Sequence, residues 1–267
     1  MTLHFSSDFW LRRGGQISDL LPAGRAGFPD CDESDESDEA ALARREARAA
    51  QDDPEPRVEL LSESDDAGAV YVPERYEPNY AYPLLVWLHN GGAGRRELMS
   101  LMSRVSTQNY LAVLVACREY PAPLPQGAAG GVVDLIDATL RSVRRRYHAH
   151  TERVYPIGFG NGASLALALV LERPELFGGG IALCGRFPDS KQPLFRFREL
   201  NRKPVLLAGG AKDERVPVAE VVRAGRLLHA AGLSVTTRVY DAGHEMTPRM
   251  LRDVDRWVMG GIGAARV

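Results

Sequence analysis

Two titratable residues and one glycine-rich turn in this chain could take part in the same reaction. Asp213 and His244 are a carboxylate and an imidazole, the pair that acts as orienting acid and general base in nucleophilic catalysis. Residues 158–162 read Gly-Phe-Gly-Asn-Gly, and small residues at alternate positions permit the tight turn on which a nucleophile is held. The middle residue, Gly160, has no side chain that could attack a carbonyl carbon. The residues therefore indicate an acyl-transfer site that lacks its nucleophile.

Each of these three features follows a predicted strand. The glycine run lies between an apolar strand over 153–157 and a helix over 162–171. Asp213 follows a strand over 204–208, and His244 follows a strand over 233–240. Because the carboxyl ends of parallel strands meet at one edge of a sheet, we expect the three features to lie together. We also expect His244 and Asp213 to be hydrogen-bonded to each other.

The rest of the pattern predicts the sheet that would position them. Continuous apolar runs over 83–89 and 111–116 are typical of strands that are covered on both faces. Strands separated by helices of 10–15 residues predict an α/β fold with a parallel sheet and helices on both faces. Further strands are predicted over 70–72 and 180–184, and further helices over 130–147, 216–231 and 247–259, the last with Thr247 as its N-cap.

Charge divides the chain into three parts. Residues 30–66 hold 15 acidic and 4 basic residues and include a low-complexity acidic tract, so we expect a disordered linker there. Residues 1–29 show little periodicity, and their structure is left open. Residues 67–267 hold 18 acidic and 26 basic residues and carry the predicted elements, so we place the folded domain there. A chain of 267 residues has room for one large α/β domain and a tail.

Composition excludes several classes of protein. No apolar stretch is long enough to span a bilayer, and the first 20 residues lack the pattern of a signal peptide. The cysteines, Cys31, Cys117 and Cys184, are odd in number and scattered, which argues against a disulfide framework or a metal site. We therefore expect a reduced, cytoplasmic protein with neither a metal nor a cofactor.

The order and spacing of these motifs resemble the α/β-hydrolase fold, and within it the phospholipase/carboxylesterase group, close to its acyl-protein thioesterase and feruloyl-esterase-like branches. The resemblance covers residues 70–259. It implies that Asp213 and His244 are triad positions and that Gly160 stands where the family has its nucleophilic serine. The phrases that carry it are Tyr-Val-Pro-Glu-Arg-Tyr-Glu-Pro (71–78), Leu-Val-Trp-Leu-His-Asn-Gly-Gly (85–92), Ile-Gly-Phe-Gly-Asn-Gly-Ala (157–163), Ile-Ala-Leu-Cys-Gly-Arg-Phe-Pro (181–188) and Gly-His-Glu-Met-Thr-Pro (243–248).

The same resemblance implies an oxyanion hole and a ligand site. The loop after the 83–89 run resembles the loop that donates one backbone N–H to the oxyanion, here from Gly91, and the second donor would be the N–H of Asn161. Asn90 departs from the glycine that is commoner at its position. Asn90, Gly92 and Cys184 are the residues expected to contact a substrate.

Three other interpretations compete for these residues. Ser164 or Cys184 could replace the missing nucleophile, or His244 could activate a water molecule. Gly158, Gly160 and Ala163 match the dinucleotide fingerprint G-x-G-x-x-G/A, but no acidic residue ends the next predicted strand. The arginines near 141–146 could bind phosphate, although a solvated helix end explains them as well.

Two functions therefore remain open from the sequence. One is a catalytically deficient carboxylesterase-like protein that keeps its pocket for a small ester or acyl ligand. The other is a working carboxylic-ester hydrolase with an atypical nucleophile or an activated water. Neither interpretation involves nucleic acid, and the assembly expected, if any, is a homodimer.

Overall fold

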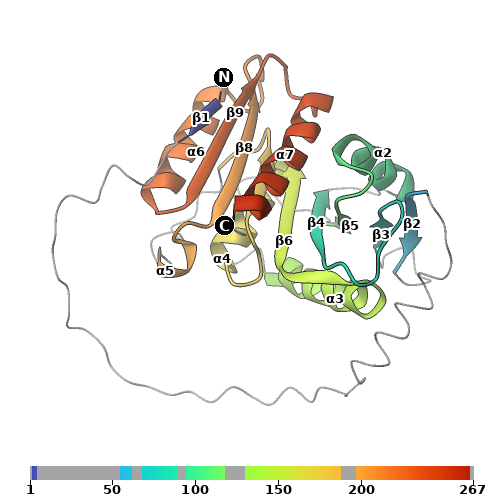
Figure 1. The fold of residues 1–267 in the computed structure, drawn as a ribbon. Coiled ribbons are helices and arrows are strands. Elements are labelled where there is room, and N and C mark those ends of the chain that lie inside the picture. The colour runs from blue at the N-terminus through green and yellow to red at the C-terminus, as the bar shows by residue number, and fades with distance from the viewer. Residues whose placement is uncertain are drawn as a thin grey trace, which may run out of the picture.

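A mostly parallel sheet runs through the middle of the protein (Figure 1). The computed structural model describes residues 2–4, 55–61, 68–89, 94–117, 130–187 and 197–264. Among these residues the sheet has nine strands in the order β1-β9-β8-β7-β6-β4-β5-β3-β2. The strands are β1 (Thr2–His4), β2 (Arg57–Leu60), β3 (Ala69–Val72), β4 (Tyr82–His89), β5 (Leu111–Ala116), β6 (Ala149–Phe159), β7 (Gly180–Leu183), β8 (Pro204–Gly210) and β9 (Ser234–Tyr240).

The direction of the strands fixes where a site can form. Strands β4 to β9 pair in parallel, whereas β1, β2 and β3 pair antiparallel at the two sides of the sheet. From β4 the chain turns outward to β5 and then crosses back to β6, so the strand order reverses between β4 and β6. Ligands of such sheets bind beyond the carboxyl ends of the strands at this switch point. The end of β6 is where the glycine run begins.

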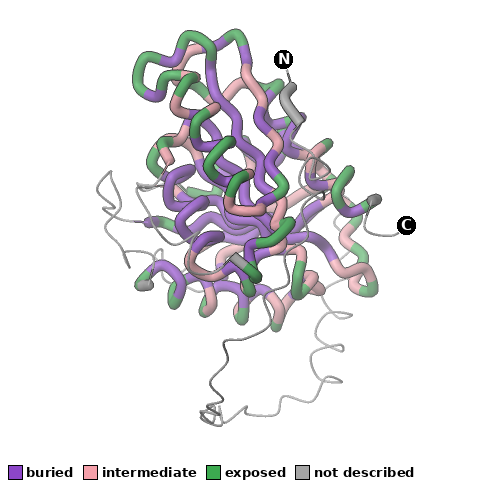
Figure 2. Tube along the Cα trace, turned by 90° about the vertical axis from the view of Figure 1, so that its left-hand side faces the viewer, coloured by how far each residue is buried: buried purple, intermediate pink, exposed green. Residues whose placement is uncertain are grey.

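Helices cover both faces of the sheet because its strands are apolar on both sides (Figure 2). Neighbouring residues of β4 point to opposite faces, with Leu84 and Val86 packed on one side and Leu85 and Trp87 on the other. Helices α3, α4 and α6 cover the first side, and α2 and α7 cover the second. Their bounds, with those of the short α5, are α2 (Arg95–Val105), α3 (Gly130–Arg146), α4 (Asn161–Glu172), α5 (Phe197–Leu200), α6 (Val218–Ala230) and α7 (Pro248–Ala264).

The predicted α/β fold is confirmed, and most predicted elements are present with ends shifted by a few residues. The N-cap predicted for α7 is confirmed, because the Met250 N–H donates to Thr247 Oγ1 at 3.2 Å. Strand β2 lies inside the segment 30–66 that was expected to be linker, so that boundary was placed too late. In β2, Val58 and Leu60 alternate with charged residues and pack against the core, a pattern that the acidic composition of the segment hides.

The arginine-rich end of α3 has a structural role. Arg146 donates to the carbonyls of Leu60 and Leu61 at 2.8 and 2.6 Å, which fastens β2 to the body of the domain. Arg144 donates to the carbonyl of Thr151 at 3.1 Å. These bonds favour the helix-end interpretation over a phosphate site. Within the described ranges, no helix is long and apolar enough to cross a membrane.

Candidate active site

The chain makes a sharp turn where β6 ends and α4 begins. Gly160 lies at this turn with φ 56° and ψ −118°, a conformation that strains any residue with a side chain. A Cβ on Gly158 would lie 2.2 Å from the carbonyl carbon of Gly162, and one on Gly162 would lie 2.3 Å from the carbonyl oxygen of Leu88. Both flanking glycines are therefore required by close backbone packing. Of the glycines that match a dinucleotide fingerprint, Gly158 is thus accounted for by packing and Gly160 by its positive φ.

Asp213 and His244 form the hydrogen bond that the sequence predicts. Asp213 Oδ2 lies 2.8 Å from His244 Nδ1, while Oδ1 accepts the N–H groups of Arg215 at 2.9 Å and Val216 at 2.8 Å. The carboxyl group is fully buried. Burial opposes its ionisation, but the bonds from Val216, His244 and Arg215 outweigh burial and lower the pKa of Asp213 below its ordinary value. The carboxylate is thus charged at neutral pH and accepts a hydrogen bond from the Nδ1–H of His244.

The loops that carry these two residues are bonded to each other. The N–H of Ala211 donates to the carbonyl of Tyr240 at 2.7 Å, and that of Lys212 donates to the carbonyl of Ala242 at 2.9 Å. A Cβ on Gly210 would lie 2.4 Å from the carbonyl oxygen of Ala242. Only glycine lets the two loops approach so closely, and this approach sets the separation of Asp213 and His244.

His244 faces the turn at Gly160. A Cβ built on Gly160 would lie 3.5 Å from His244 Nε2 and 3.9 Å from Cε1 of the same ring, and outside the adjacent residues of the chain it would meet no other described atom within 4 Å. The ring of Phe159 lies 4.8 Å from the His244 ring, centre to centre, and supports it from the side. In the neutral imidazole, Nδ1–H donates to Asp213, so the lone pair is on Nε2, the nitrogen that faces residue 160.

Ser164 is badly placed to act as a substitute nucleophile. Ser164 lies on the first turn of α4, and its hydroxyl donates to the carbonyl of Arg186 at 2.7 Å. The side chain is also buried. The hydroxyl therefore stabilises the loop after β7 and has its proton engaged there.

Cys184 contacts the acid of the pair, Asp213. Its backbone is in the left-handed region, with φ 50°, and the residue is fully buried. The thiol lies beside Asp213 and 3.9 Å from the carbonyl oxygen of Glu245. Burial and the negative charge of Asp213 raise its pKa to about 11, so it is a protonated thiol. The expected contact between Cys184 and a substrate is therefore replaced by a contact with Asp213.

Of the two expected oxyanion donors, the structure describes Asn161 but not Gly91. Asn161 is the first residue of α4, where a backbone N–H has no acceptor within the helix and the helix dipole favours negative charge. Gly91, and with it Asn90 and Gly92, lies outside the described residues. Among the described residues there is no cluster of three or more side chains that could hold a metal ion.

A mostly parallel sheet with a glycine-flanked turn after β6, an acid after β8 and a histidine after β9 defines an α/β-hydrolase. The family model described as phospholipase/carboxylesterase matches residues 126–259, half of the chain, and the protein belongs to this family. The region matched contains Gly160, Asp213 and His244. The sequence did not predict that Phe159 supports His244, although Phe159 adjoins the turn. It also did not predict the backbone N–H groups that hold Asp213.

Relatives and solved structures agree with this assignment. Carboxylesterase SOBER1 of Arabidopsis thaliana is 29% identical over 109 residues, which are 40% of this chain and 48% of SOBER1. A protein of rice (Oryza sativa subsp. japonica) named "Probable inactive carboxylesterase" is 30% identical over 107 residues, 39% of this chain and 44% of its own. This chain spans about half the length of the curated relatives it matches. The crystal structure of a Mesorhizobium loti carboxylesterase shares the fold, with a TM-score of 0.58 at 20% identity over 76% of this chain and 99% of that one.

Proposed function

We propose that this protein binds a small carboxylic ester or acyl ligand at the site formed by Gly160, Asp213 and His244, and that it does not hydrolyse the ligand. The observation that carries the proposal is the 3.5 Å between His244 Nε2 and a Cβ at residue 160. A hydroxyl one bond beyond that Cβ could reach hydrogen-bond distance of the imidazole, about 2.6–3.2 Å. Residue 160 thus holds the nucleophile position, and glycine supplies no nucleophile.

Two further observations support a site kept for binding. The turn around Gly160 is held by backbone contacts of Gly158 and Gly162, so it does not depend on the side chain at its centre. The Asp213 carboxylate is buried and fully hydrogen-bonded, which would be costly to keep without the His244 partner. The rice relative that is named an inactive carboxylesterase is consistent with a member of the family that lacks hydrolysis.

When an ester binds, the groups around residue 160 would each contact a different part of it. The N–H of Asn161 and the amino end of α4 would attract the carbonyl oxygen of the ligand. Nε2 of His244 would face the carbonyl carbon across residue 160. With no hydroxyl between them, no covalent bond forms, and the ligand is bound without being cleaved.

A second function is favoured by the intact pair of Asp213 and His244. Nε2 carries a lone pair and could remove a proton from water, which would then attack the carbonyl carbon. A site of this kind retains roughly 10³–10⁴-fold catalysis over water in hydrolases that lack triad members. The hydrogen bond of Ser164 and the protonated thiol of Cys184 argue against either residue as the attacking group.

A direct comparison of hydrolysis rates distinguishes the two proposed functions. We expect the wild type and His244→Ala to hydrolyse p-nitrophenyl acetate and p-nitrophenyl butyrate at the same slow rate, because the base has no nucleophile to activate. The measurement is the initial rate of p-nitrophenolate release under identical conditions. A wild-type rate clearly above that of His244→Ala would instead establish a working hydrolase that uses His244.

A further inference from the structure

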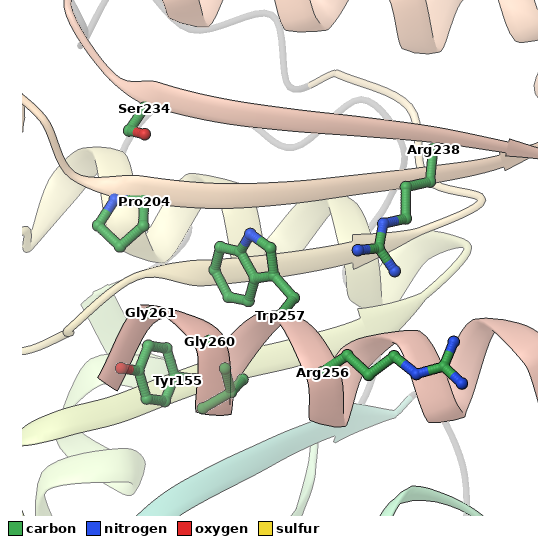
Figure 3. Close-up of a pocket in the computed structure, with 9 residues that line it drawn as sticks. Tyr155, Pro204, Ser234, Arg238, Arg256, Trp257, Gly260 and Gly261 are labelled. Carbon is green, nitrogen blue, oxygen red and sulfur yellow. The ribbon is translucent and has the colours of Figure 1, made fainter. Parts of the chain in front are cut away.

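A partly open cavity lies beneath the last turns of α7, against strands β6, β8 and β9 (Figure 3). Its volume is about 330 Å³, within the range of sites that take small molecules. Pro204 and Ser234, the first residues of β8 and β9, form part of its rim. Asp213 and His244 follow the other ends of these strands, and neither residue lines this cavity. This cavity, which we call the α7 cavity, has no part in the proposed function.

Two aromatic rings form the walls of the α7 cavity. Trp257 of α7 and Tyr155 of β6 meet edge to face, with ring centres 6.2 Å apart and planes at 75°. The Trp257 indole N–H donates to Thr236 Oγ1 at 3.2 Å, which fixes the orientation of the ring. Figure 3 shows Trp257 reaching from α7 toward β8 and β9. Rigid aromatic walls of this kind favour a flat ligand.

Glycines leave the helix side of the cavity open. Gly260 and Gly261 of α7 line the cavity, and a Cβ on either would meet no atom within 4 Å. Packing therefore does not require glycine at these positions. Each glycine inside a helix costs about 1 kcal/mol relative to alanine. Both glycines are exposed at the cavity, where the absence of a side chain leaves its opening unobstructed.

The α7 cavity also carries a surplus of positive charge. Arg238 and Arg256 both line it, and both pair with the single carboxylate of Asp253 at 3.0 Å. Asp253 accepts the Tyr240 hydroxyl as well, at 2.8 Å, so its oxygens are engaged. Although burial opposes its ionisation, the bonds from Tyr240, Arg238 and Arg256 lower the pKa of Asp253, so the carboxylate is charged. Two guanidinium groups against one carboxylate leave one positive charge.

Both arginines could donate a further hydrogen bond to an acceptor on a ligand. Arg238 Nε is buried and has no hydrogen-bond partner among the described residues, which leaves the charge of its guanidinium incompletely compensated. The Arg256 side chain is 69% exposed and directs one nitrogen to Asp253. Its guanidinium can therefore pair with an anion at the mouth of the cavity. A guanidinium pairs with a carboxylate through two parallel hydrogen bonds where the geometry allows.

We propose that the α7 cavity is a binding site for a small aromatic carboxylate. The ring of the ligand would lie between Trp257, Tyr155 and Pro204, over the backbone of Gly260 and Gly261, and its carboxylate would pair with Arg256 and the surplus charge of Arg238. The flat shape follows from the aromatic walls, and the negative charge follows from the two arginines.

Benzoate is the simplest probe of this site. In the full-length protein with ¹⁵N-labelled tryptophan, we expect sodium benzoate to shift the indole N–H signal of Trp257 saturably at millimolar concentrations. This signal is assigned with Trp257→Phe. Benzyl alcohol, which has the ring without the charge, and acetate, which has the charge without the ring, should each bind at least tenfold more weakly.

Matched variants locate the site on α7. Gly260→Leu should fill the cavity and abolish the shift, whereas Gly263→Leu, the same change at an exposed position outside the cavity, should leave it intact. Arg256→Gln should weaken benzoate binding about tenfold, and Arg252→Gln, one turn earlier, should not. Thermal melting shows whether each variant is folded.

Three results would overturn the proposal. They are the absence of a saturable Trp257 shift, benzoate binding that survives Gly260→Leu, and equal binding of benzyl alcohol and benzoate.

Discussion

Gly160→Ser is expected to convert the protein into an esterase. A serine at this position would place its Cβ about 3.5 Å from His244 Nε2, and its hydroxyl within hydrogen-bond reach of the base. Asp213 and His244 are already hydrogen-bonded at 2.8 Å, and in the proposed site the N–H of Asn161 would stabilise the oxyanion. We expect a burst of p-nitrophenolate from p-nitrophenyl acetate, followed by turnover on the order of 10³-fold or more above the wild type.

The gain should depend on the histidine and carry a small cost in stability. The double variant Gly160→Ser/His244→Ala should return to the rate of His244→Ala alone. Serine at φ 56° costs of order 1–3 kcal/mol of unfolding free energy, so Gly160→Ser should unfold at lower urea than the wild type. A folded Gly160→Ser that shows neither a burst nor turnover would contradict the view that only the nucleophile is missing.

The largest loss of stability is expected from Gly162→Ala. Alanine is the better helix former, and Gly162 is the second residue of α4. The added methyl group, however, would lie 2.3 Å from the backbone oxygen of Leu88, which cannot move without displacing β4. We therefore expect a loss of about 3 kcal/mol or more of unfolding free energy, measured by urea denaturation.

Gly260→Ala is the control for this prediction. Gly260 also lies in a helix, but its Cβ would meet no atom within 4 Å. The same substitution should there stabilise the protein by about 0.5–1 kcal/mol. If the two substitutions changed the unfolding free energy equally, the backbone of α4 could move away from Leu88 of β4 at little cost.

Much of this site could be predicted from the sequence because its residues follow strands. Apolar runs placed β6, β8 and β9, and the rule for parallel sheets then brought Gly160, Asp213 and His244 to one edge. The hydrogen bond between Asp213 and His244 follows from the same placement. Thr247 was found as the N-cap of α7 because Pro248 follows it, the favoured pair at a helix start.

Other features depend on local geometry that composition does not contain. Cys184 directly follows β7, one residue beyond the end of the strand, and its left-handed backbone places the thiol beside Asp213. Helix α2 was missed, although Leu98, Met102 and Val105 recur at helical spacing and are buried. The α7 cavity could not be foreseen, because it forms only where the end of one helix crosses the starts of strands distant in sequence.

We propose that the site at Gly160 still receives an ester-like ligand. The most direct measurement follows the His244 ring signals by NMR while phenyl propyl ketone is added to the wild type. This ketone has the shape of phenyl butyrate and no bond to cleave. We predict saturable shifts of the His244 signals that are lost in Gly160→Leu, whose side chain would occupy the space before Nε2. Binding that persists in a folded Gly160→Leu, or His244 signals that do not respond to the ketone, would contradict the account.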